Sequence, residues 1–204
     1  MKRWSRDRAE RAEQILAQYP QPRSAVMPLL YLAMAEHGYL SNQAMAEVAG
    51  LTGLTPAQVL SAASFYTMYK RAPVGKYLVS VCTSISCHLL GGEAVLEAVE
   101  RATATPHGET SQDQVFSVEH VECLGACGGA PAVQVNYELV EGINPERAKL
   151  LCEWLRRAAP ACVRADEMQA LFGGQRSFDW GPPDRSGATV PVPAFGPLGT
   201  LGEE

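Results

Sequence analysis

Two hydrophobic patterns divide the chain near residue 72. Before that position, apolar residues recur at helical spacing, and helix start signals precede several of the segments. Ser24 and Ser41 are candidate N-caps, Gly38 is a candidate helix end, and Thr55 opens a capping box with Pro56 at the first helical position. The predicted helices cover residues 6–19, 24–37, 41–50 and 56–69. Short connections between them predict a small helical bundle over residues 1–72.

Beyond Pro73 and Gly75 the pattern predicts strands as well as helices. Residues 77–81 form an apolar run typical of a buried strand, and residues 115–121 alternate from one face to the other. Two more strands are expected at 132–135 and 138–140, and helices at 89–102 and 145–155. This order predicts a compact α/β domain over residues 73–165, so the expected fold class of the whole chain is α+β.

Residues 166–204 show neither the helical spacing nor the strand alternation of apolar residues. Glycine and proline recur along this segment, which we take to exclude a packed core, and we expect a Gly/Pro-rich tail. The tail still carries the aromatic residues Phe178, Trp180 and Phe195. Two interpretations stay open: a flexible tail, or an arm that orders only against a partner.

The overall composition is that of an ordinary globular protein. Charged residues make up 19% and the net charge is −5, so electrostatics favours neither nucleic acid nor an anionic membrane as a partner. The longest apolar stretch, residues 25–35, is about half the length of a membrane span. The first residues are basic with no apolar run behind them, so we expect no secretory signal and a cytoplasmic location. In reducing conditions, cysteines favour metal ligation or catalysis over disulfides.

Four of the six cysteines form two close pairs. Cys82 and Cys87 follow the first predicted strand, and Cys123 and Cys127 follow the second. We therefore expect the pairs to converge at the mouth of the sheet. Thiolates suit zinc, copper(I) or iron–sulfur clusters, and the spacing alone leaves a structural four-cysteine zinc site open. A 2Fe–2S cluster takes two thiolates per iron, so the two pairs match its symmetry, one pair for each iron.

The residues around the second pair favour a cluster. Gly125, Gly128 and Gly129 surround Cys127, and glycines let backbone amides approach the sulfurs; the alternative is that they only make tight turns. The remaining cysteines are interpreted differently, Cys152 as a buried apolar residue and Cys162 as a free thiol.

Motifs for nucleotide binding are absent from the sequence. No glycine-rich dinucleotide fingerprint follows a strand, and no phosphate-cradling loop ends in Gly-Lys-Ser/Thr. We therefore expect that the chain alone binds neither NADH nor flavin.

Two segments around the cysteines resemble a known family. Residues 81–87 and 121–136 closely resemble the thioredoxin-like 2Fe–2S ferredoxin family that includes the 24-kDa (E) subunit of respiratory complex I, the NADH–quinone oxidoreductase. The likeness extends to the predicted bundle, at residues 28–33, 36–41 and 63–69, and runs from about Arg8 to Leu155. Tyr137 stands where the family often has Asp, which affects the expected turn and not the ligands.

This resemblance implies a fold, a cofactor and an assembly. It implies a thioredoxin-like ferredoxin domain behind a helical bundle, with one 2Fe–2S cluster on Cys82, Cys87, Cys123 and Cys127. It places FMN and NADH on a partner flavin subunit, with other peripheral-arm subunits of complex I as further partners. The chain would then be part of an oxidoreductase without being catalytic alone, held at the cytoplasmic side of the inner membrane through the complex. It would neither insert into the membrane nor bind nucleic acid.

Two alternatives accompany this interpretation. The first keeps the cluster but places it in an NAD-linked hydrogenase or a formate dehydrogenase. The second, of another class, is a structural zinc scaffold.

Overall fold

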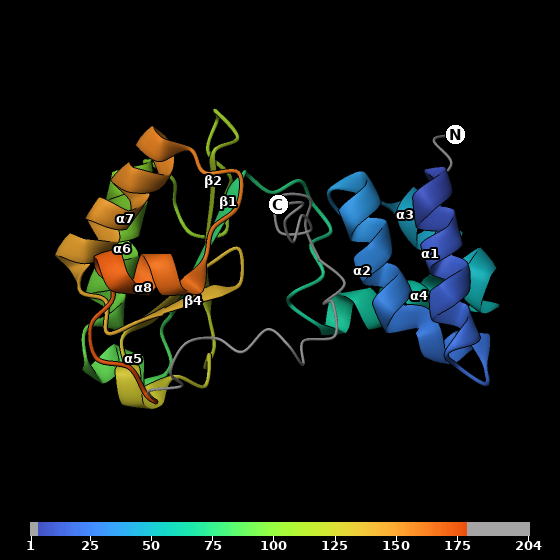
Figure 1. The fold of residues 1–204 in the computed structure, drawn as a ribbon, viewed down its shortest axis with the longest axis horizontal. Helices are drawn as coiled ribbons and strands as arrows, with labels where there is room; N and C mark the ends of the chain where they lie inside the picture. The colour runs from blue at the N-terminus through green and yellow to red at the C-terminus, as the bar shows by residue number, and fades with distance from the viewer. Residues whose placement is uncertain (1–3, 179–204) are drawn as a thin grey trace. The chain divides into compact units, whose positions relative to one another are not determined.

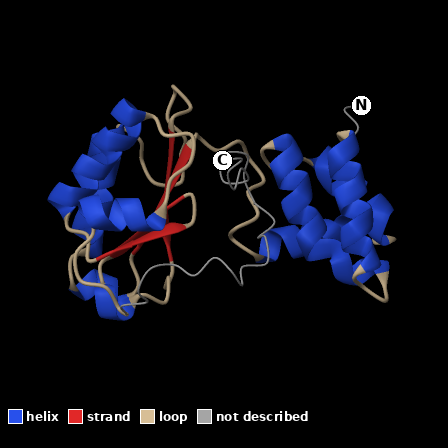
Figure 2. Cartoon of the chain, viewed as in Figure 1, coloured by secondary structure: helices blue, strands red, loops and turns tan. Residues whose placement is uncertain are grey.

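A computed structural model of the 204-residue chain describes residues 4–178. The described residues fall into two compact units, one ending at Pro73 and the other beginning at Val74 (Figure 1). The first unit contains only helices among its described residues, whereas the second combines helices with a sheet (Figure 2). The α+β fold class expected from the sequence is confirmed. Trp180 and Phe195 of the expected tail lie outside the described residues.

The first unit is a bundle of four α-helices and one 3-10 helix. They are α1 (Arg6–Ala17), η1 (Pro22–Ala25), α2 (Val26–His37), α3 (Asn42–Thr52) and α4 (Pro56–Phe65). Two predicted caps are confirmed, because the Ser41 hydroxyl accepts the Ala44 N–H at 3.1 Å and Thr55 makes a reciprocal capping box with Gln58. Gly38 ends α2 in the left-handed conformation, with φ of 81°.

Two expectations for the bundle were wrong. Ser24 does not cap α2, because it lies inside η1 and α2 begins at Val26. Helix α4 ends at Phe65 rather than near residue 69, since Tyr66 adopts an extended backbone. The chain then turns back, and the buried Tyr69 donates its hydroxyl to the Met27 carbonyl at 2.9 Å. Packing onto α2 thus overrides the helical spacing of these aromatic residues.

The second unit is built on a four-stranded mixed sheet. Its strands are β1 (Tyr77–Cys82), β2 (Phe116–Val121), β3 (Ala132–Val135) and β4 (Glu138–Glu141), in the spatial order β2-β1-β3-β4. Strands β1 and β2 are parallel, whereas β3 runs antiparallel to both β1 and β4. Every residue of β1 is buried, as its continuous apolar run predicts for a central strand.

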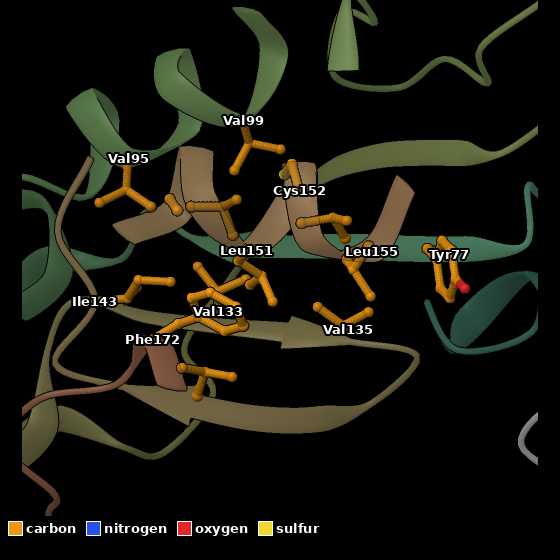
Figure 3. Close-up of a cluster of buried hydrophobic side chains, with 14 of the residues drawn as sticks. Tyr77, Val95, Val99, Val133, Val135, Ile143, Leu151, Cys152, Leu155 and Phe172 are labelled. Atoms are coloured by element: carbon orange, nitrogen blue, oxygen red, sulfur yellow. The ribbon is translucent and has the colours of Figure 1, made fainter. Parts of the chain in front are cut away.

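Helices cover this sheet and complete its core. They are the short α5 (Ile85–Leu89), α6 (Gly92–Thr103), α7 (Pro145–Ala158) and α8 (Ala165–Phe172). Side chains of α6 and α7 meet those of the central strands in one apolar cluster (Figure 3). The cluster includes Val95, Val99, Leu151, Leu155, Val133 and Val135. No helix among residues 4–178 has the length and apolar character needed to span a membrane.

Helix α8 corrects the expectation that no packed core follows residue 166. Met168 and Phe172 belong to the core cluster, and the Phe172 ring lies 5.7 Å from that of Trp154. In this segment, apolar residues recur at helical spacing over only about two turns before Gly173. This pattern is too short to predict a helix next to the glycines and prolines that follow.

The difference in burial between two neighbouring residues of α8 allows a test of whether this helix packs into the core. Phe172 is 7% exposed and Leu171 is 55% exposed. Replacing Phe172 with alanine should lower the free energy of unfolding by about 3 kcal/mol, because a buried ring leaves a cavity. Leu171→Ala should change it by less than about 0.5 kcal/mol. Urea denaturation followed by circular dichroism measures both, and equal effects would show that α8 is not part of the folded unit.

Candidate metal centre

The strand register brings all four paired cysteines to one edge of the sheet. Cys82 is the last residue of β1 and stands opposite Val121, the last residue of β2. Because the two strands are parallel, their carboxyl ends meet there, and Cys123 follows only two residues later. Strand β3 is antiparallel to β1, so its first residues, which follow Cys127, lie at the same edge. The expected convergence at the mouth of the sheet follows from this register.

The first pair is enclosed by apolar residues. Cys82 and Cys87 are buried in a small cluster with Ala126 and Ala132. Helix α6 begins close to this pair, since a Cβ on Gly92 would lie 2.8 Å from the Cys82 carbonyl oxygen. Only glycine therefore allows α6 to start here, and its start closes one side of the first pair.

The pKa of the Cys87 thiol is affected by cysteines of both pairs. Burial, and next the hydrogen bond with Cys82, raise the pKa of the Cys87 thiol to about 11. The charge of Cys127 raises this pKa as well, so the second pair lies within electrostatic reach of the first. A hydrogen bond from the Ala132 amide acts in the opposite direction, because it stabilises the thiolate. Binding of a metal at Cys87 would displace a proton from the thiol.

The second pair has the spacing of two ligands on one metal. The Sγ atoms of Cys123 and Cys127 are 3.7 Å apart, and both residues are exposed. Two thiolates, each about 2.3 Å from one tetrahedral metal ion, are separated by about 3.8 Å. The Gly125 amide approaches the Cys123 sulfur at 3.4 Å, as expected of a glycine beside this cysteine. The separation of the two sulfurs therefore fits two thiolates on one metal ion.

The four cysteines fit a cluster with two thiolates at each iron. Among residues 4–178 there is no group of three or more His, Cys, Asp or Glu side chains placed to hold a single metal ion. A 2Fe–2S cluster does not need such a group, because inorganic sulfide completes the coordination of each iron. One enclosed pair and one exposed pair at the same sheet edge would fit such a cluster.

The other cysteines lie apart from this edge. Cys152 is in the apolar core, and burial raises the pKa of its thiol to about 12. It is the buried core residue expected from the sequence. Cys162 donates weakly to the carbonyl of Val163, at 3.5 Å.

The sequence did not predict the hydrogen bonds that hold the loop carrying Cys123 and Cys127. The Gly129 amide donates to the Ser177 hydroxyl at 3.0 Å, and the Ser177 amide donates to Glu141 Oε1 at 2.9 Å. Ser177 lies in the segment expected to be an unstructured tail, where neither periodicity nor a motif identifies it.

Comparison with known proteins identifies relatives for most of the chain. The sequence profile of the thioredoxin-like [2Fe-2S] ferredoxin family matches residues 12–156, which include all four paired cysteines. The E subunit of the NADH-quinone oxidoreductase from Mycobacterium bovis is 42% identical over 170 residues, which cover 79% of this chain and 68% of that protein. A second relative, from Thermus thermophilus and also an NADH-quinone oxidoreductase subunit, is 39% identical over 153 residues, 74% of this chain and 84% of its own.

Solved structures add a second group. An NAD+-reducing [NiFe]-hydrogenase in its H2-reduced state superposes with a TM-score of 0.58 at 25% identity. The match covers 65% of this chain but only 22% of the hydrogenase chain, so this chain spans about a fifth of that protein.

The difference in burial predicts the order of thiol modification in the metal-free chain. Cys123 and Cys127 should react readily with iodoacetamide, whereas Cys152 should react at least about a thousandfold more slowly, because its modification requires unfolding. Peptide mass spectrometry at timed intervals measures each rate. Comparable rates at Cys152 and Cys123 would contradict the burial of Cys152 in the core.

Proposed function

The chain belongs to the thioredoxin-like [2Fe-2S] ferredoxin family, and on this premise we propose that it is the electron-transfer subunit of an NADH–quinone oxidoreductase. Its ligands are Cys82, Cys87, Cys123 and Cys127. The observation that carries the proposal is the convergence of the two pairs at the edge set by β1 and β2, with a metal-chelating separation in the second pair. When bound, the cluster accepts and returns one electron at a time.

The two pairs contribute differently to holding the cofactor. Cys82 and Cys87 anchor it from inside, where apolar neighbours exclude water. Cys123 and Cys127 hold it from the exposed side, so the route for electrons runs through this loop. The Gly125 amide directed at Cys123 stabilises negative charge on the sulfur.

The partner supplies the chemistry that this chain lacks. The relatives from Mycobacterium bovis and Thermus thermophilus are subunits of NADH-quinone oxidoreductases, which supports a place in such a complex. We propose that FMN and NADH bind to the neighbouring flavin subunit, and that the flavin exchanges single electrons with this chain. The complex then places the chain on the cytoplasmic side of the inner membrane, beside other subunits of the peripheral arm.

A second assembly is supported by the structural comparison. The likeness to an NAD+-reducing [NiFe]-hydrogenase supports the same cluster in a hydrogenase as the alternative. A tagged copy of the chain, expressed in its own cells and purified under mild conditions, distinguishes the two. Capture of a flavoprotein with NADH–quinone reductase activity supports the proposal, whereas capture of a nickel-containing enzyme with hydrogen-dependent NAD+ reduction supports the alternative.

Metal analysis tests the cluster itself. Protein made with ample iron should contain about two irons and two acid-labile sulfides per chain. Cys123→Ser should lose most of the visible absorption, because one iron loses a thiolate ligand, while Cys162→Ser serves as the matched control and should keep it. One zinc per chain and no sulfide would establish the zinc scaffold instead.

A further inference from the structure

Residues 173–177, which we call the strap, follow α8 and return to the second cysteine loop. In Figure 1 this is the red trace that leaves α8 and runs toward α5. The strap pairs with the end of β4, where the Gly174 amide donates to the Glu141 carbonyl at 2.8 Å. Its last residue, Ser177, bridges the Glu141 carboxylate and the Gly129 amide, at 2.9 and 3.0 Å.

Side chains of two helices fix the start of the strap. The Gln169 side-chain amide of α8 donates to the carbonyls of Glu141 and Gly174, at 3.1 and 3.2 Å. Its oxygen accepts the Glu141 amide at 2.8 Å. Arg147 of α7 donates to the Gly173 carbonyl at 2.6 Å. The strap is therefore tied to α7, α8 and β4 before it reaches the cysteine loop.

Glycines on the cysteine loop make this approach possible. A Cβ on Gly129 would lie 2.6 Å from Glu141 Oε1 and 2.7 Å from the Gln175 carbonyl oxygen. A Cβ on Gly128 would lie 3.2 Å from the Ser177 Cα. The backbones of the loop and the strap are in direct contact, so a shift in one moves the other. The glycines beside Cys127 thus admit the strap as well as forming a turn.

We propose that Ser177 is a positioning residue that fixes the Cys127 side of the cluster site, an inference that rests on the proposed function. Cys127 begins the 3-10 turn η2 (Cys127–Gly129), and Ser177 holds the amide at the end of that turn. The buried Gly129 N–H is shared between the Ser177 hydroxyl, at 3.0 Å, and the Ala126 carbonyl of the same turn, at 3.1 Å, so Ser177 supplies its acceptor from outside the turn. By holding this amide, the strap keeps Cys127 at its chelating separation from Cys123.

The strap lies outside the region that defines the family. The family profile matches residues 12–156, and the strap begins at residue 173. Cluster retention and potential depend on ligand geometry, hydrogen bonds and solvent access. A segment beyond the matched region therefore adjusts a cofactor whose four ligands all lie within it.

The test compares variants of the full-length chain purified with its cluster. Ser177→Ala removes the hydroxyl. Gln175→Ala is the control on the same strap, since Gln175 approaches Gly129 through its backbone carbonyl oxygen. Ser177→Thr and Ser177→Val form a second pair of similar shape, with and without the hydroxyl, should the alanine variant fold poorly. Three quantities are measured: the midpoint potential by spectroelectrochemistry, the rate of cluster loss to a chelator, and hydrogen exchange at Gly129 in the metal-free chain.

We expect Ser177→Ala and Ser177→Val to shift the midpoint potential and to lose the cluster several-fold faster. Gly129 exchange in these variants should rise several-fold, because the amide keeps only the Ala126 carbonyl as its acceptor. Ser177→Thr and Gln175→Ala should behave like the parent chain. If the parent chain holds its cluster and the Ser177→Ala and Ser177→Val variants behave like the parent in all three measurements, the inference is wrong but the proposed function stands. A parent chain that binds no cluster overturns both.

Discussion

The parallel pairing of β1 and β2 is the constraint on which the site depends. These strands are separated in sequence by α5, α6 and a long loop, yet Cys82 and Val121 end in register. A shift by one residue would reverse the faces of β2 and move Cys123 away from Cys82. The apolar packing of α6 and α7 on the sheet fixes this register, so the hydrophobic core determines the ligand geometry.

On the proposed function, one half of the site would retain the cluster and the other would exchange electrons. Cys82 and Cys87 are buried among alanines against the start of α6. Cys123 and Cys127 lie on an exposed loop held by glycine amides and by the strap. A redox cofactor needs both: enclosure for retention, and an accessible edge for electron exchange with another protein.

The sequence predicted the parts of this chain that rest on local signals. The caps at Ser41 and Thr55, the glycine that ends α2 and the apolar strand β1 are each specified by a few neighbouring residues. The spacing of the cysteines along the sequence predicted two pairs at the strand ends for the same reason. Tyr69 was misplaced because its contact with Met27 spans 42 residues, and α8 was missed because only tertiary packing distinguishes it from the glycine-rich segment behind it. Ser177 could not be found at all, since its role comes from a hydrogen bond to Gly129, 48 residues away.

The strap also sets the order in which the site is completed during synthesis. The chain leaves the ribosome from its N-terminus, so Cys82 and Cys87 emerge well before Cys123 and Cys127. The hydroxyl that locks the second loop emerges last, 50 residues after the final cysteine of the site, as Cys127 and Ser177 are numbered. On the proposed function, a nascent chain thus carries all four ligand sulfurs before the strap can fix their geometry. On the proposed function, iron delivered during translation would meet a loop that the strap has not yet fixed, so the finished chain would be the better acceptor.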